Sequence, residues 1–184
     1  MNKGEFGYLK DFKKKRLFLS IGITVLMAAV IGLGLWLNKG DIKNIYTVVG
    51  ILFALPLAMM LSGLLVVMPM KTMEESVQKE LLAQLSHAGS DQFLWDLALS
   101  STEKVRHFPC IIWSDHHVVA WHEGQDNKAQ TYLSNLMKNN CHRVTVKVLN
   151  DKDAFVKEAK ATNFGVTSEE EWERIKENIL VCEM

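Results

Sequence analysis

Two apolar stretches decide the architecture: Leu17–Leu37 (LFLSIGITVLMAAVIGLGLWL) and Ile45–Met68 (IYTVVGILFALPLAMMLSGLLVVM). Neither stretch contains Lys, Arg, Asp, Glu or His. A helix needs roughly 20 apolar residues to cross a hydrocarbon core about 30 Å thick, and each stretch reaches that length. A signal peptide would supply only one shorter apolar core, of about 7–15 residues. The sequence therefore predicts a two-helix transmembrane hairpin.

Basic residues predict the orientation of this hairpin. Lys13–Arg16 directly precede the first span, whereas the loop between the spans carries only Lys39 and Lys43. Lys and Arg near span ends are retained on the cytoplasmic side. We therefore expect a multi-pass cell-membrane protein whose N-terminus and C-terminal domain are cytoplasmic. Its expected segments are a basic arm (1–16), a first transmembrane helix (17–37), a short external loop (38–44), a second transmembrane helix (45–69) and an α/β domain (70–184). The arm also predicts contact with anionic lipids of the inner leaflet.

Small residues recur at every fourth position in both spans. The stripes are Ser20, Thr24, Ala28 and Gly32 in the first span, and Gly50, Ala54, Ala58 and Ser62 in the second. Such a stripe forms one helix face and lets backbones approach closely in lipid. We expect the two stripes to face each other, with self-association of copies as the alternative. Pro56 predicts a kink in the second span.

The chain after the spans has the opposite charge balance to the arm before them. From Lys71 to Met184 it carries 13 basic and 18 acidic residues, a net charge of −5. Nonspecific nucleic-acid binding depends on Lys and Arg that neutralise phosphates, so we expect no nucleic-acid partner. The three cysteines, Cys110, Cys141 and Cys182, form no C-x-x-C pair. Together with a cytoplasmic location, this predicts reduced thiols.

Hydrophobic periodicity predicts a small mixed α/β domain. The expected helices are Glu74–Ala88, Asn127–Lys138, a helix from an Asp151 cap to about Ala161, and a last helix capped by Thr167 or Ser168. The expected strands are Pro109–Ser114, Val118–His122 and Arg143–Leu149, while Phe93–Ser100 fits either a strand or a helix. The natural architecture for this order is one sheet with helices packed on it.

The segment most suggestive of chemistry is residues 113–123, WSDHHVVAWHE. Its Asp115, His116, His117, His122 and Glu123 are residue types that bind zinc and other transition metals. Strand alternation, however, places His117 and His122 on opposite faces. This favours a structural hairpin with a solvated tip over a metal-binding or acid–base site.

The cysteines and His142 do not identify a functional site either. His142 lies beside Cys141, but no second such pair completes a four-ligand set. Cys110, on an expected strand, is interpreted as a small core residue rather than a nucleophile. We assign no catalytic, cofactor-binding or metal-binding residue, and we expect no cofactor.

The core order α-β-β-β-α-β resembles the restriction-endonuclease-like fold, including nuclease-related domains of some bacterial membrane proteins. In that family one strand carries an acidic residue and the next carries Glu-x-Lys for metal-assisted phosphodiester hydrolysis. The matching residues 120–125 here read AWHEGQ, so Glu123 matches while Gln125 replaces the lysine. Pro109-Cys110 offers no acidic partner, and the nearest carboxylate is Asp115. The resemblance implies a degenerate form of this fold.

A second resemblance covers nearly the whole chain. The basic arm, the two spans with Leu55-Pro56 in the second, and the α/β tail are similar to a family of uncharacterised two-span bacterial membrane proteins. Some members are labelled O-linked GlcNAc transferase-like. The chain has no Gly-rich nucleotide loop, no Asp-x-Asp and no helical repeat array, so its motifs do not support that label.

Three classes of function remain. The favoured class is a non-catalytic, membrane-anchored interaction or assembly module with a protein partner or a second copy of itself. The alternative is a hydrolase on a degenerate nuclease-like fold. A subunit of a transport complex is a third class. A concave pocket with clustered polar residues would favour the enzyme. An exposed apolar patch on a flat surface would favour the interaction module.

Overall fold

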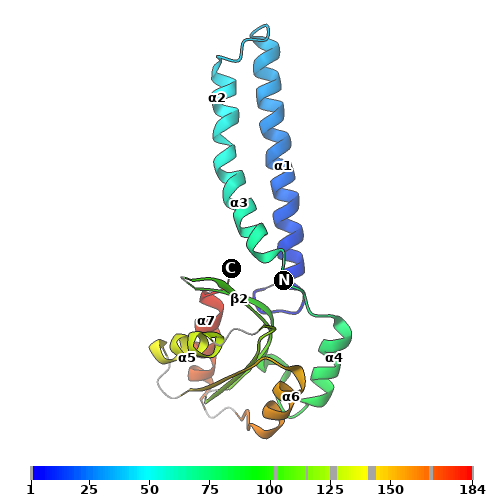
Figure 1. The fold of residues 1–184 in the computed structure, drawn as a ribbon, viewed down its shortest axis with the longest axis vertical. Coiled ribbons are helices and arrows are strands. Elements are labelled where there is room, and N and C mark those ends of the chain that lie inside the picture. The colour runs from blue at the N-terminus through cyan, green and yellow to red at the C-terminus, as the bar shows by residue number, and fades with distance from the viewer. Residues whose placement is uncertain are drawn as a thin grey trace. The chain divides into compact units, whose positions relative to one another are not determined.

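The described part of the chain consists of two compact units (Figure 1). A computed structural model describes residues 2–101, 103–114, 116–124, 128–140, 144–165 and 168–183, with the backbone alone at 139 and 140. One unit is Lys10–Met70, and the other combines Met1–Leu9 with Lys71–Met184. We call the first unit the apolar hairpin and the second the α/β domain.

The apolar hairpin contains two helical segments long and apolar enough to cross a membrane. The first is α1 (Tyr8–Leu37), and the second is α2 (Ile45–Leu52) continued by α3 (Ala54–Val67). Only 11% of the most apolar 18-residue window is buried in each segment. A core helix of a soluble protein would bury its apolar face, so the exposure agrees with the predicted spans.

The break between α2 and α3 confirms the kink predicted from Pro56. Proline has no N–H, so the Leu52 carbonyl lacks its usual donor four residues on. The helix is interrupted at Phe53, whose N–H bonds to the Gly50 carbonyl at 3.1 Å instead. Pro56 then lies in the first turn of α3, where the missing donor costs least.

The expected packing of the small-residue stripes is wrong. Thr24, Ala28 and Gly32 are exposed, as are three of the four small residues of the second stripe. Gly50, the buried member of that stripe, meets α1, where an added Cβ would clash with the Ile31 side chain. Gly34, outside either stripe, packs against Tyr46. The contact face of α1 is thus rotated away from the stripe, because larger side chains such as Ile31 fill the space beside a single glycine.

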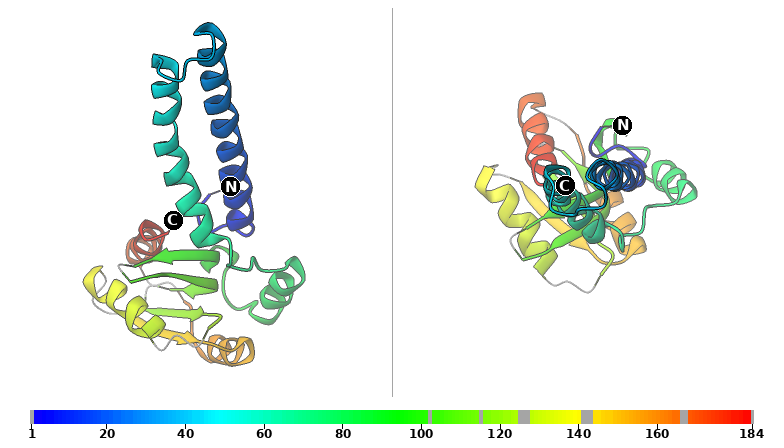
Figure 2. Two further views of the ribbon diagram at one scale, coloured as in Figure 1. Left: turned by 45° about the horizontal axis from the view of Figure 1, so that its top comes forward. Right: turned by 90° about the horizontal axis from the view of Figure 1, so that it is seen from above.

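The α/β domain is built on one four-stranded sheet in the order β1-β2-β3-β4 (Figure 2). The strands are β1 (Phe93–Ser100), β2 (Val105–Trp113), β3 (His117–Trp121) and β4 (Thr145–Leu149). The first three pair antiparallel, and β4 pairs parallel to β3 after the crossover helix α5 (Lys128–Asn140). The mixed sheet confirms the expected architecture. Phe93–Ser100 is a strand, and β2 begins four residues before the expected start at Pro109.

Strands β1 and β2 share an irregularity that explains the ambiguous apolar run. Asp96 has a left-handed backbone, with φ +50°, and lies between the pairs Trp95↔Cys110 and Leu97↔Phe108. The side-chain alternation shifts there, so Leu97 shares a core cluster with Leu94 while Trp95 faces the other cluster. Two apolar triplets around one aspartate therefore form one strand buried on both faces.

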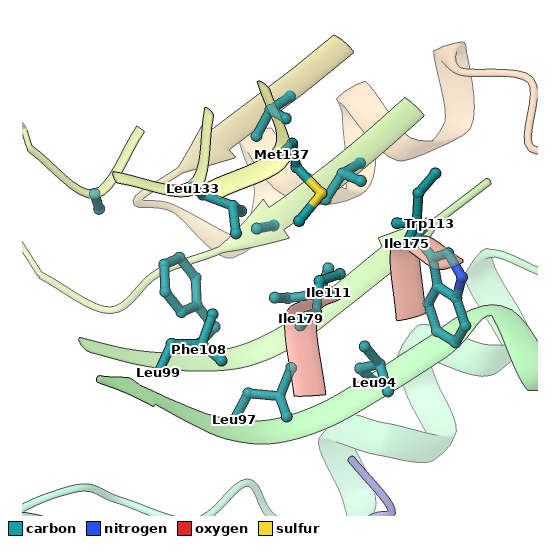
Figure 3. Packing of buried hydrophobic residues seen from close by; sticks show 14 residues of the cluster. Leu94, Leu97, Leu99, Phe108, Ile111, Trp113, Leu133, Met137, Ile175 and Ile179 are labelled. Carbon is teal, nitrogen blue, oxygen red and sulfur yellow. The ribbon is translucent and has the colours of Figure 1, made fainter. Parts of the chain in front are cut away.

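Helices cover both faces of the sheet. On one face α5 and α7 (Glu169–Val181) bury the core cluster drawn in Figure 3, which includes Phe108, Trp113 and Ile175. On the other face α4 (Glu75–Gln84) and α6 (Lys152–Ala161) pack on a second cluster. The expected caps are confirmed at Asp151, which accepts from the Ala154 N–H, and at Ser168. Thr167 lies outside the described residues, and α4 ends four residues before the expected Ala88.

Other parts of the domain occupy both edges of the sheet. At β1, the Trp95 N–H donates to the Gly4 carbonyl at 2.9 Å, and the Ser100 N–H donates to the Cys182 carbonyl at 2.8 Å. At β4, the amide of Gln130 on α5 donates to the Val146 carbonyl at 2.7 Å and accepts from the Val148 N–H. The side chain of Gln130 thus occupies two of the backbone groups that a further strand would bind.

Candidate functional site

A polar cavity opens where the turn between β1 and β2 meets α5. Its volume is about 400 Å³. The residues that line it are polar or charged except for one aromatic ring: Ser101, Glu103, Arg106, Lys128, Thr131, Tyr132 and Asn135. We call this the turn–α5 pocket. Its size is within the range of small-molecule sites.

Arg106 is the buried cation of the turn–α5 pocket. Its side chain is 3% exposed. Its Nη1 donates to the Ser101 Oγ at 2.8 Å, and its guanidinium lies 5.0 Å from the centre of the Tyr132 ring. Its Nη2 is 3.8 Å from a Glu103 carboxylate oxygen, which is an ion pair longer than a hydrogen bond. The aromatic ring and the serine therefore hold the guanidinium at the wall of the pocket.

Glu103 joins the two cations of the pocket. Its carboxylate lies 3.2 Å from the Lys128 Nζ as well as 3.8 Å from Arg106. The Glu103 side chain is 59% exposed, so it reaches the cations from the solvent side. The Glu103 carboxylate thus lies between two cations.

Tyr132 contributes its aromatic ring to the pocket, and its hydroxyl does not act as an acid there. Its hydroxyl donates to the Ser100 carbonyl at 2.8 Å. Burial, helped by the neighbouring Cys182, raises the pKa of Tyr132 to about 12. The phenol is therefore neutral at physiological pH. The described lining offers charged and hydrogen-bonding groups from the turn and from α5.

A second polar group lies inside the domain, at the irregularity of β1. Asp96 is fully buried and accepts a hydrogen bond from the Met73 N–H at 2.9 Å. The His107 Nε2 lies 3.6 Å from the same carboxylate oxygen. Burial, together with the nearby Asp96 charge, raises the pKa of the Cys110 thiol well above its usual value. The group is enclosed by the second core cluster, so it fixes the backbone rather than forming an accessible site.

The suggestive segment 113–123 does not assemble into one cluster. His116 and Glu123 are exposed, and His117 is half-buried at the start of β3. His122 is buried, with its Nδ1 2.8 Å from the His107 carbonyl oxygen, so the expectation of a wholly solvated tip is wrong for this residue. Asp115 lies outside the described residues. Within the described part of the chain, no three His, Cys, Asp or Glu side chains are placed to hold a metal ion.

The remaining candidates from the sequence are the cysteines and His142. Cys110 is a free, fully buried thiol in the second core cluster, as its strand position predicted. Cys182 is free and half-buried. Cys141 and His142 lie outside the described residues.

Sequence reasoning missed both polar groups. Arg106 and His107 precede the expected strand start at Pro109, so they read as a loop rather than as buried strand residues. The turn–α5 pocket joins residues about 25 positions apart, which no local pattern relates. A signal for the buried group did exist, in a single aspartate inside the apolar run FLWDLAL.

Comparison with protein-family models, curated protein sequences and solved structures finds no match for this chain.

Proposed function

We propose that this protein is a membrane-anchored cytoplasmic α/β module that serves interaction or assembly rather than catalysis. The supporting observation is the distribution of exposed large hydrophobic side chains. Among the described residues, all of them lie between Leu17 and Met68 except Val181. Lipid would cover this apolar surface, while the rest of the chain presents a polar surface to water.

The polar surface of the α/β domain bears on how it would recognise a partner. In the described residues outside the hairpin, Val181 is the one exposed large hydrophobic side chain. Recognition would therefore rely on charged and hydrogen-bonding groups. The turn–α5 pocket is a concave site among the described residues that offers such groups.

Reporter fusions test the proposed anchoring and orientation. A reporter that is active only in the cytoplasm and one that is active only outside are each fused after Met184. We expect activity from the cytoplasmic reporter alone, and retention of the protein in membranes washed at alkaline pH. A matched variant exchanges Lys13–Arg16 for glutamine and adds four lysines to loop 38–44. This variant should reverse the reporter pattern. Release by the alkaline wash, or external activity of the unmodified chain, would overturn the proposal.

Site-specific photocrosslinking in cells tests the interaction. We would place the photoreactive residue at Asn135, on the rim of the turn–α5 pocket, and at Lys157, an exposed position on α6. A discrete adduct from Asn135 and none from Lys157 is expected. Equal, diffuse labelling at both positions would argue against a defined partner surface.

The strand order favours a second candidate, a hydrolase on a degenerate nuclease-like fold. The helix–three-strand–helix–strand order along the chain is the order on which the resemblance rests. Cys110, where that family carries its first acid, pairs with Trp121, two residues before Glu123, the residue that matches the second. The test incubates the detergent-solubilised protein with Mn²⁺ and DNA or RNA. Cleavage that disappears in Glu123→Gln but persists in Glu177→Gln would favour this candidate over the interaction module.

A further inference from the structure

We propose that one face of α1 is a binding groove for an anionic phospholipid, with the headgroup at Lys14 and Lys15 and an acyl chain along the residues that follow. This inference rests on the membrane anchoring proposed above and assigns a lipid partner to the anchored chain. The groove lies wholly within the apolar hairpin and has a volume of about 600 Å³. Its lining comes from α1 alone, from Lys14 and Lys15 at one end to Leu26 at the other. We call it the α1 groove.

The first argument is the positive charge at one end of the α1 groove. Lys14 and Lys15 are exposed, and within the described residues neither makes an ion pair or a side-chain hydrogen bond. Lys13 differs, because its Nζ donates to the Met70 carbonyl on the chain that follows α3. Each basic residue near a membrane surface gains about 1 kcal/mol from anionic lipid. The two exposed lysines of the groove are therefore suited to a phosphate headgroup.

The second argument is the shape of the groove beyond the lysines. Phe18, Gly22 and Leu26 follow one another at every fourth position, so they lie along one face of the helix. The Phe18 side chain is 65% exposed and the Leu26 side chain is 48% exposed. An added Cβ at Gly22 would meet nothing within 4 Å. The glycine therefore leaves an open notch between two large apolar side chains, which an acyl chain would fill.

The third argument is the length of the groove. Lys15 and Leu26 are separated by about 16 Å along the helix, at about 1.5 Å per residue. This is about half of a hydrocarbon core that is about 30 Å thick, so the groove extends through about one leaflet. An acyl chain attached to a headgroup occupies that same depth.

The position of the charge also distinguishes a lipid from a second copy of the chain. A second α1 inserted in the same orientation would bring its own Lys14 and Lys15 to the same depth. Like charges at close range repel each other. A lipid phosphate brings the opposite charge to that end of the groove and an apolar chain to the rest.

Native mass spectrometry of the full chain, released from detergent micelles, tests the site. The probes are phosphatidylglycerol and phosphatidylcholine with identical acyl chains, and glycerol phosphate as a headgroup without a chain. We expect phosphatidylglycerol to bind more tightly than phosphatidylcholine. Glycerol phosphate should give no adduct, because it lacks the apolar part of the ligand.

A pair of double variants tests the lysines. Lys14→Gln with Lys15→Gln should weaken phosphatidylglycerol binding by roughly 30-fold, which corresponds to about 1 kcal/mol for each basic residue. The matched control, Lys39→Gln with Lys43→Gln, removes the same charge from the loop between the spans. It should leave the affinity unchanged.

A pair of single variants tests the notch. Gly22→Leu fills the groove and should weaken phosphatidylglycerol binding several-fold. The matched control is Gly32→Leu, because Gly32 is also an exposed glycine of α1 with nothing within 4 Å of an added Cβ. This control should bind phosphatidylglycerol as the unmodified chain does. Circular dichroism checks that each variant keeps its helices.

Several outcomes would overturn the lipid site. They are equal binding of the two phospholipids, full affinity after loss of both lysines, and equal effects of the two leucine substitutions. An adduct with glycerol phosphate would show that a free anion is sufficient. A dimer that is lost in Gly22→Leu would replace the lipid by a second copy. The alkaline wash measures anchoring separately, so a chain retained in membranes without these lipid preferences would overturn the lipid site alone.

Discussion

Replacing Asp96 by alanine and by glycine separates two roles of this buried residue. Its carboxylate accepts from the Met73 N–H at 2.9 Å, and its backbone has φ +50° inside a strand. A hydrogen bond to a charged group contributes about 1.5–3 kcal/mol. The left-handed conformation costs a residue with a Cβ about 1 kcal/mol more than glycine.

Both substitutions remove the hydrogen bond, but only alanine retains the backbone strain. We expect Asp96→Ala to lower the free energy of unfolding by about 3 kcal/mol, and Asp96→Gly by about 2 kcal/mol. For a domain of this size, these losses correspond to Tm decreases of roughly 12 °C and 8 °C. The control is Asp153→Ala, at an exposed position on α6, which should cost about 0.5 kcal/mol or less.

Thermal unfolding of the full chain in detergent, followed by tryptophan fluorescence, measures these differences. Four of the five tryptophans lie in the α/β domain, and Trp95 adjoins Asp96. Hydrogen exchange at the Met73 amide provides a local measure, because both variants should expose it. Equal Tm values for the alanine and glycine variants would refute the strain argument. A decrease below about 4 °C in both would refute the role of the carboxylate.

Three further predictions concern other parts of the fold. Ser168→Ala and Asp151→Ala each remove a side-chain cap and should each lower the unfolding free energy by about 1 kcal/mol in denaturant titrations. Burial raises the pKa of Glu183 to about 7, with the Lys3 charge offsetting only part of the shift. The folded chain therefore keeps a proton that the unfolded chain releases above about pH 4.5. This contribution to stability is complete below that pH and is lost as pH rises through 7. The decrease in Tm between pH 5 and pH 8 should accordingly be smaller in Glu183→Gln. Pro56→Ala restores a donor for the Leu52 carbonyl, so the new amide at position 56 should be protected from hydrogen exchange. An unprotected amide would show that the break at Phe53 has another cause.

Local patterns predicted the parts of the fold that local physics determines. The two apolar helices follow from length and charge alone, and the caps at Asp151 and Ser168 follow from single side chains beside a helix start. The break before Pro56 follows from a missing N–H. Each of these depends on residues within a few positions of one another, so the sequence contains the whole cause.

The errors arose where distant residues compete for the same space. Spacing alone identified Ala28 as part of a contact face, but the packing of Ile31 against Gly50 turned that face away. The burial of Arg106 depends on Tyr132 of α5, 26 positions away. The ring of buried His122 makes a hydrogen bond to the backbone carbonyl of His107, on a neighbouring strand. Such positions become predictable only once the pairing of the strands is known.

The occupied sheet edges have a consequence for the membrane-anchored arrangement proposed above. Chains anchored in one bilayer meet at high local concentration and in a common orientation, which are the conditions under which open strand edges join from molecule to molecule. Here the residues around Gly4 and Cys182 occupy one edge, and the amide of Gln130 occupies the other. Backbone pairing between neighbours is therefore hindered at both edges of the sheet. Crowding on the membrane should leave these domains separate unless side chains bring them together.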